Sequence, residues 1–144
     1  IYAIACGIAD GLDSGENTVG MIMTRGLGEM GRLASELGAN PQTFLGLAGV
    51  GDLITTCASP LSRNHQFGKL IGKGMSVDDA KTQIGQTIEG LKTLKVVKII
   101  SDEHKVKMPI VDSLYKIIYK GSNLNGSIQN VLGEDMLKDV EFIK

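Results

Sequence analysis

The stretch NTVGMIMTRGLGEMGRLASEL, residues 17–37, decides the fold of this chain. Its apolar residues recur at spacings of three and four, at Met23, Leu27, Met30, Ala34 and Leu37. This is the period of an α-helix that turns one apolar face inward. Asn17 is a suitable N-cap, and Gly38 is a suitable residue to end the helix. The spacing therefore predicts one long helix that is mostly buried.

The same stretch contains GLGEMG, from Gly26 to Gly31, which matches the dinucleotide-binding pattern GxGxxG. Asp52 stands about twenty residues further on, where that pattern expects an acidic residue. The pattern binds a pyrophosphate only when a strand precedes the first glycine and a new helix begins after it. Because these glycines fall inside one continuous helical period, we predict that they allow close helix packing and bind no nucleotide.

The remaining segments also have helical spacing, and none alternates between polar and apolar residues for long. We expect helices over residues 1–9, from Pro41 to Gly46, from Ser62 to Gly72, from Ser76, from Thr87 through Ile100, from Pro109 to Gly121, and over residues 127–132. Asn40, Ser62 and Ser76 are the expected caps of three of these helices. The chain is therefore predicted to be all-α, with residues 1–144 in one layered multi-helix domain.

Composition narrows the range of partners. The 144 residues carry 15 Lys and Arg against 16 Asp and Glu, which gives a formal net charge of −1. Nucleic acids and anionic membranes attract proteins with a broad positive field, so we expect no nucleic-acid binding and no membrane insertion. No apolar run approaches the roughly 18–20 residues of a membrane span, and no signal-peptide pattern opens the sequence. We therefore expect a soluble, cytoplasmic protein.

Two cysteines, Cys6 and Cys57, stand far apart in the sequence, without a CxxC pair or a histidine at metal-ligand spacing. We expect both to be small buried apolar groups, and we expect no metal site. The chain begins at Ile1 inside the apolar stretch IYAIACGIADG. This start suggests a piece of a longer protein.

The least ordinary segment is GLAGVGDLITT, residues 46–56, which mixes glycines with one aspartate. Asp52 stands at an expected helix start between the apolar residues Val50 and Leu53, so we expect its side chain to be buried. Two interpretations remain open. Asp52 stabilises the N-terminus of its own helix, or it accepts hydrogen bonds from substrate hydroxyls or a lysine ammonium in an apolar cleft.

Ser62, Arg63 and Asn64 combine a hydroxyl, a guanidinium and an amide at another expected helix start. Unpaired N–H groups and the helix dipole favour an anion at such a position, and an arginine can bind a phosphate through two N–H groups. An ordinary serine cap followed by two polar residues would have the same sequence. Spacing alone leaves both interpretations open.

Five segments, taken together and in order, carry a family resemblance. They are MTRGLGEM (23–30), LGANPQTFLGLAGVGDLITTC (37–57), SRNHQFG (62–68), GQTIEG (85–90) and VKMPIVDSLYKIIYKG (106–121). They resemble the C-terminal helical domain of bacterial NAD(P)-dependent glycerol-3-phosphate dehydrogenase, a domain of the 6-phosphogluconate-dehydrogenase-like superfamily. The likeness covers nearly the whole chain, including its first helix.

The resemblance implies a substrate site. The family's substrate-site aspartate falls on Asp52. The residues that hold the phosphate and glycerol portions in the family fall on Ser62, Arg63 and Asn64, and Thr56 is expected to line the same site. The resemblance therefore favours the binding interpretation of both helix starts.

The resemblance also implies contacts with NAD or NADP. Arg63 matches a family residue that reaches the cofactor as well as the substrate. The family's cofactor-contacting glutamate falls on Glu89, and an apolar contact two residues before it is replaced by Thr87 in this sequence. The family's nucleotide-binding domain precedes the matched region, so the resemblance implies that most of the cofactor is held outside this chain.

The resembling family interconverts sn-glycerol 3-phosphate and dihydroxyacetone phosphate by hydride transfer, as the first step toward glycerophospholipids. Its catalytic lysine precedes the segment that matches Ile1, and Asp52 would orient that lysine. We therefore expect this chain to be inactive on its own. The alternatives are a freestanding all-helical interaction module and the helical domain of another reductase of the superfamily. The expected partners are a small phosphorylated substrate and, in a homodimer, a second copy of the chain.

Overall fold

The computed structural model describes residues 1–124 and 126–127. Its elements, in chain order, are α1 (Tyr2–Gly11), α2 (Glu16–Glu36), the 3₁₀ turn η1 (Pro41–Leu45), the π-helical turn η2 (Leu47–Gly51), α3 (Asp52–Ala58), α4 (Arg63–Gly72), α5 (Val77–Ile84), α6 (Glu89–Glu103) and α7 (Pro109–Lys120). The described residues contain helices and no strand, so the all-α prediction is confirmed.

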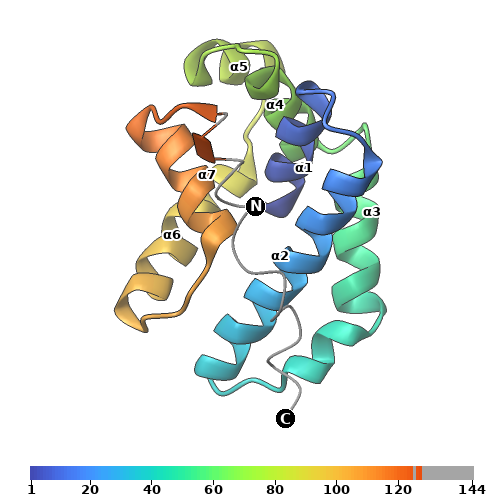
Figure 1. Cartoon of the computed structure of the whole chain (residues 1–144), viewed down its shortest axis with the longest axis vertical. Helices are drawn as coiled ribbons and strands as arrows, with labels where there is room; N and C mark the ends of the chain where they lie inside the picture. The colour runs from blue at the N-terminus through green and yellow to red at the C-terminus, as the bar shows by residue number, and fades with distance from the viewer. Residues whose placement is uncertain (125, 128–144) are drawn as a thin grey trace.

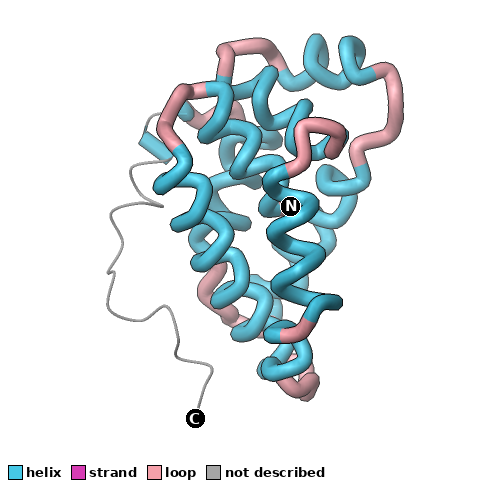
Figure 2. The backbone as a smooth tube through the Cα atoms, turned by 90° about the vertical axis from the view of Figure 1, so that its right-hand side faces the viewer, coloured by secondary structure: helices cyan, strands magenta, loops and turns pink. Residues whose placement is uncertain are grey.

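Helix α1 lies at the centre of the fold, beside α4 (Figure 1). Helices α2 and α3 lie on one side of it, and α6 and α7 lie on the other. Figure 2 shows the same helices from a view turned by 90°, joined by loops at the surface. Every residue from Tyr2 to Ala9 is buried, because α1 is apolar on all its faces and every face meets a neighbour.

The backbones of α1 and α4 touch where glycines face each other. A Cβ atom on Gly68 would lie 2.0 Å from the carbonyl oxygen of Ile4, and one on Gly7 would lie 2.1 Å from the carbonyl oxygen of His65. Any side chain at these positions would force the two helices apart. The glycines thus fix the start of α4 against the central helix.

The long helix predicted over residues 17–37 is present, with two corrections. It begins at Glu16 with Gly15 as its N-cap, so Asn17 is not the cap. It is buried along one face rather than over most of its surface, and Leu37 is 52% exposed. Gly38 follows the helix with φ +79°, as expected of the residue that ends a helix.

The GxGxxG pattern lies wholly inside α2, and no strand precedes it in the described residues. Gly26 and Gly28 are buried, and a Cβ atom on Gly26 would lie 2.8 Å from the ring of Tyr2. The prediction that these glycines serve helix packing is therefore confirmed, and the pattern forms no nucleotide-binding loop.

A buried carboxylate joins α2 to α1 and α7. Glu29 is 1% exposed. Its Oε1 accepts a hydrogen bond from the backbone N–H of Ile110 at 2.6 Å, and its Oε2 accepts from Val111 at 3.4 Å and from the Tyr2 hydroxyl at 3.2 Å. Glu29 thus caps α7 from a neighbouring helix. Burial raises the pKa of this carboxyl from 4.5 to about 7.

The other predicted helix ends agree with the structure to within a few residues. Asn40, Ser62 and Ser76 each accept a backbone N–H as N-caps, as predicted. The helix expected from Thr87 begins at Glu89, two residues later. The short helix expected over residues 127–132 lies, apart from Ser127, outside the described residues.

Both cysteines are buried free thiols, as predicted. In the described part of the chain, no group of three or more His, Cys, Asp or Glu side chains could hold a metal ion. None of the helices described here combines the length and the hydropathy that crossing a membrane requires.

Candidate functional site

Three segments that are distant in the sequence meet around one open hollow of about 410 Å³. They are the end of α3, the loop that leads into the start of α4, and the start of α6. The lining residues are Thr55, Thr56, Ser59, Leu61, Ser62, Arg63, Asn64, Thr87 and Glu89. The fold therefore brings together six of the residues singled out in the sequence, from Thr56 to Glu89.

The start of α4 forms one wall of the hollow. Ser62 is the N-cap, and its hydroxyl oxygen accepts the backbone N–H of His65 at 3.3 Å. The first N–H groups of a helix have no partner inside the helix, and they carry a partial positive charge. Ser62 is thus a cap and a lining residue at once, beside donors that suit an anion.

Arg63 supplies the positive charge of the hollow. Its Nη1 donates a hydrogen bond to Oε1 of Gln86 at 3.1 Å. This bond uses one of the five N–H donors of the guanidinium and leaves the others free for an anion. Gln86 was not singled out in the sequence, because nothing in the spacing of two residues 23 positions apart indicates the contact.

Asn64 joins the starts of two helices. Its Oδ1 accepts the backbone N–H of Gly90, in the first turn of α6, at 3.0 Å. A Cβ atom on Gly90 would lie 2.5 Å from that oxygen, so any side chain here would displace the Asn64 amide. With Oδ1 held by α6, the NH₂ group of Asn64 remains as a donor at the hollow.

His65 joins the start of α4 to α3 and α1 through its two ring nitrogens. Its Nδ1 lies 2.7 Å from the carbonyl oxygen of Cys57, and its Nε2 lies 3.2 Å from Oδ2 of Asp10. Both ring nitrogens thus face oxygens. Lys69 also contacts Asp10 at 2.8 Å, and the hydrogen bonds from Lys69 and His65 lower the pKa of Asp10.

Asp52 departs from its prediction. It is the first residue of α3 and is exposed, so the expectation of a buried side chain is wrong, and it does not line the hollow. The reason is local, since a first-turn acid on a surface helix keeps its hydration while it interacts with the helix dipole. Thr55 and Thr56, three and four residues further along α3, do line the hollow. Asp52 thus lies one helical turn away from it.

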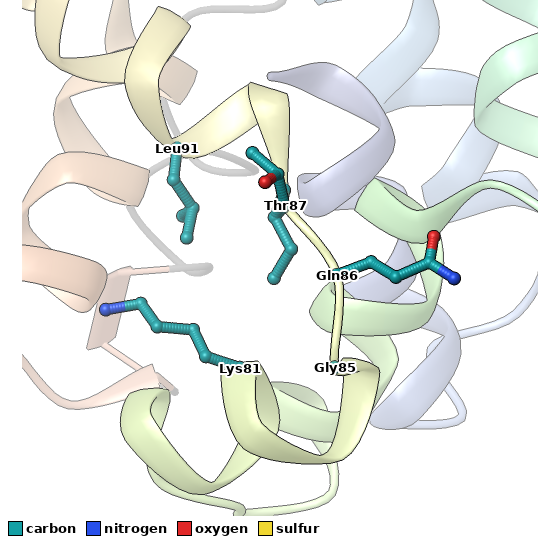
Figure 3. Close-up of a pocket in the computed structure, with 6 residues that line it drawn as sticks. Lys81, Gly85, Gln86, Thr87 and Leu91 are labelled. Atoms are coloured by element: carbon teal, nitrogen blue, oxygen red, sulfur yellow. The ribbon is translucent and has the colours of Figure 1, made fainter.

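Thr87 and Glu89 form the end of the hollow at α6, and both are exposed. A second hollow of about 440 Å³ lies on the other side of the segment that leads into α6, and Thr87 borders both. Figure 3 shows Leu91 and the stem of Lys81 around this second hollow, while Gln86 points away from it. Glu89 offers carboxylate oxygens that can accept hydrogen bonds from hydroxyl groups.

The lining residues define what the first hollow can do. It offers a guanidinium, an amide, several hydroxyls and the N–H groups of a helix start to an anion, and a carboxylate to a hydroxyl-bearing group. No lysine, histidine or cysteine of the described residues lines it. The hollow is therefore equipped to bind and orient a phosphorylated ligand, and it holds no ordinary proton-transfer group besides Glu89.

The comparisons with known proteins all point to the same family. The family described as the NAD-dependent glycerol-3-phosphate dehydrogenase C-terminus matches residues 1–129. Glycerol-3-phosphate dehydrogenase [NAD(P)+] of Pseudomonas aeruginosa (strain LESB58) is 52% identical over 143 residues, which are 99% of this chain and 42% of that protein. The enzyme of the same name from Pseudomonas syringae pv. syringae (strain B728a) is 50% identical over the same share.

Two solved structures share the fold. The crystal structure of glycerol-3-phosphate dehydrogenase from Coxiella burnetii superposes with a TM-score of 0.89 at 40% identity, and covers 91% of this chain and 40% of that one. The glycerol-3-phosphate dehydrogenase of Saccharomyces cerevisiae gives a TM-score of 0.81 at 28% identity, over 90% and 38% of the two chains. The chain thus spans less than half the length of the relatives it matches.

Proposed function

The chain belongs to the NAD-dependent glycerol-3-phosphate dehydrogenase family, and from this premise we propose that it forms the substrate-binding part of an enzyme that interconverts sn-glycerol 3-phosphate and dihydroxyacetone phosphate. The observation that carries the proposal is the shared hollow. Residues from α3, α4 and α6 that the family resemblance assigns to substrate and cofactor line one open space.

In this proposal the phosphate lies at the start of α4. Arg63 binds it with the N–H donors that Gln86 leaves free, and Ser62, Asn64 and the first N–H groups of α4 add further donors. Thr56 borders the glycerol portion. Because the phosphate is remote from carbon 2, its binding energy aligns that carbon for hydride transfer without taking part in the chemistry.

NAD or NADP supplies the hydride when it is bound. Glu89 and Thr87 fit such a cofactor, since both are exposed at one end of the hollow and the Glu89 carboxylate can accept ribose hydroxyls. Arg63 lines the same hollow as Thr87 and Glu89, so one guanidinium can serve both ligands. The glycines of α2 take no part, because they are packed inside a helix.

Asp52 has a separate part in the proposal. Its exposed carboxylate has no hydrogen-bond or ion-pair partner among the described residues, and it stands one turn from Thr56. It is therefore free to orient a lysine supplied by a segment outside this chain, as the family resemblance implies. Such a carboxylate would hold the ammonium in place and stabilise its charged form.

We also propose that the enzyme works in the cytoplasm and as a homodimer. Two free thiols, Cys6 and Cys57, are typical of a reducing compartment. The exposed aliphatic residues of α6 offer a surface for a second copy.

The proposal is tested by titrating the 144-residue chain with sn-glycerol 3-phosphate and following backbone amide shifts by NMR. We expect shifts centred on Arg63 and Asn64, similar shifts with inorganic phosphate, and none with glycerol. Arg63→Ala should weaken binding at least about tenfold, or about 1.4 kcal/mol, because it removes a charge-assisted contact. Lys73→Ala, which removes an exposed cation at the far end of α4, is the matched control. Equal binding by the Arg63→Ala variant would overturn the proposal.

A further inference from the structure

Cys6 and Cys57, which the proposed function leaves unused, meet where α1 packs against α3. Both side chains are 0% exposed, and both belong to the same apolar core. A hydrogen bond joins the two thiols, although the residues stand far apart in the sequence. Both are free thiols in this structure. The fold therefore places two reduced sulfurs side by side on neighbouring helices.

The hydrogen bond makes the two thiols unequal. The bond from Cys6 lowers the pKa of the Cys57 thiol despite its burial, because it stabilises the thiolate. The same bond, together with burial, raises the pKa of Cys6. The thiolate is the form of cysteine that acts as a nucleophile. Cys57 is thus the sulfur equipped to react first, with Cys6 beside it as the second sulfur.

The short helix α3 gives a small reagent a way to Cys57. Among the seven described residues of α3, Cys57 is the one that is buried. A helix this short has little stability of its own, and segments with few buried residues open locally more readily than the rest of a fold. Opening of α3 exposes Cys57 to a reagent the size of hydrogen peroxide, while Cys6 stays in the buried helix α1.

Cys57 is also connected to the hollow described above. Its carbonyl oxygen lies 2.7 Å from Nδ1 of His65, in the first turn of α4. The backbone N–H of His65 donates to the Ser62 hydroxyl oxygen at 3.3 Å. Thr56, the residue before Cys57, lines the hollow together with Ser62. A shift of Cys57 therefore reaches both the α3 wall and the α4 wall of the hollow.

We propose that Cys6 and Cys57 form a redox-sensitive pair, which hydrogen peroxide converts into a disulfide that weakens anion binding at the hollow. The formation of the bond rests on the contact of the two thiols, whereas its effect on anion binding rests on the proposed function. A disulfide holds its sulfurs about 2.05 Å apart, closer than two thiols in contact. The bond thus draws Cys57 toward α1, and it displaces Thr56 and the contact with His65. A binding site loses affinity when its groups leave their fixed positions.

The reaction takes two steps. The Cys57 thiolate attacks one oxygen of the peroxide, so that an S–O bond forms and the O–O bond breaks, and the released hydroxide takes up a proton to become water. Cys6 then attacks the sulfur of the resulting sulfenic acid, so that the S–S bond forms and the S–O bond breaks. The proton of Cys6 leaves with that oxygen as a second water. The two sulfurs lose two electrons in total, and the peroxide gains them.

The first test treats the folded 144-residue chain with hydrogen peroxide, alkylates the remaining thiols in denaturant, and analyses a digest by mass spectrometry. We expect one pair of peptides linked through Cys6 and Cys57, with neither cysteine alkylated, and release of the pair by dithiothreitol. Cys6→Ala and Cys57→Ala should form no bond within the chain, and circular dichroism checks that both are folded. Two thiols that remain free in the treated wild type, or separate sulfenic or sulfinic acids, would overturn the proposal.

The second test compares the hollow in the reduced and the bridged chain by NMR. The bond should shift the amide signals of Thr56, Ser62 and His65 without any ligand, and should lower the affinity for inorganic phosphate at least about threefold. The matched control is the Cys6→Ala/Cys57→Ala double variant under the same treatment, because it contains the same six methionines, which peroxide also oxidises. Its phosphate affinity should stay constant.

The outcomes separate this proposal from the proposed function. Equal phosphate affinity of the reduced and the bridged wild type, or unchanged amide signals, would overturn the link between the cysteine pair and the hollow. A reduced chain that binds no phosphate would instead contradict the proposed function. The linked peptides and the ligand-free amide shifts would still decide whether the pair forms and whether it acts on the hollow.

Discussion

Replacing Glu29 with Gln removes the charge of a buried carboxylate that caps α7, and should remove the pH dependence that this group imposes on folding. In the folded chain the Glu29 side chain is 1% exposed and accepts three hydrogen bonds, from Tyr2, Ile110 and Val111. Those bonds favour the ionised form, but burial outweighs them and raises the pKa from 4.5 to about 7.

The difference in pKa fixes the direction and size of the effect. A carboxyl that titrates at about 7 in the folded chain and near 4.5 in the unfolded chain holds its proton more tightly when folded. The free energy of unfolding is therefore highest below pH 4.5 with respect to this group, and it falls as the pH rises toward 7. The full loss is on the order of 3 kcal/mol, from about 1.4 kcal/mol per pKa unit.

Gln is close in shape to a protonated Glu, so Glu29→Gln should match the wild type near pH 4.5 and should be more stable by about 2–3 kcal/mol above pH 7. Urea unfolding followed by circular dichroism, at a series of pH values from 4 to 8, measures the difference. The control is Glu16→Gln, which replaces an exposed carboxylate at the start of the same helix and should show no such pH-dependent gain in stability. Parallel pH curves for the wild type and Glu29→Gln would refute the argument.

The remaining predictions concern ligand binding at the hollow, the substitution of two helix glycines, and catalysis by the chain. Gln86→Ala should lower the affinity for inorganic phosphate about threefold, because Arg63 loses one hydrogen bond, and should leave urea unfolding unchanged. Gly68→Ala should destabilise the chain by about 2 kcal/mol or more, since its Cβ would lie 2.0 Å from a backbone oxygen of α1. Gly20→Ala, where a Cβ atom meets nothing within 4 Å, should instead stabilise the chain by up to about 1 kcal/mol, as measured by the same unfolding assay. The 144-residue chain should not oxidise NADPH with dihydroxyacetone phosphate, because no lysine among the described residues lines its hollow; measurable turnover would contradict this.

The fold could be predicted because helical period and capping residues are local signals. Ser62 and Ser76 were expected to cap helices, and both accept the predicted N–H groups. Asn17 was expected to do so and does not, because Gly15 is the N-cap and the helix begins two residues earlier than predicted. Leu37 was expected to be buried, but it is the residue that follows α2 and is 52% exposed. The spacing of apolar residues predicts a helix and its inward face, whereas packing against other helices decides which of those residues are buried.

The candidate site was predictable only where its chemistry is carried by adjacent residues. Arg63 and its neighbours stand together in the sequence, at a helix start that has a physical reason to bind an anion. Gln86 contacts Arg63 through a bond that spans 23 positions, and Glu29 caps a helix that begins 80 residues later, so no local pattern could indicate either role. The burial of Asp52 was misjudged for a related reason, since apolar neighbours in a sequence do not imply an apolar neighbourhood in space.

The two interpretations of the segment 62–64, an ordinary helix cap or a binding site, do not compete in the structure. Ser62 both caps α4 through its hydroxyl and lines the hollow, and Asn64 both holds the first turn of α6 through its amide oxygen and lines the hollow. A helix start needs acceptors for its free N–H groups and offers the remaining ones to a ligand. Two helix starts held together by one asparagine therefore place donors for an anion at a fixed spacing. The capping bonds are what would make the site rigid before any ligand arrives.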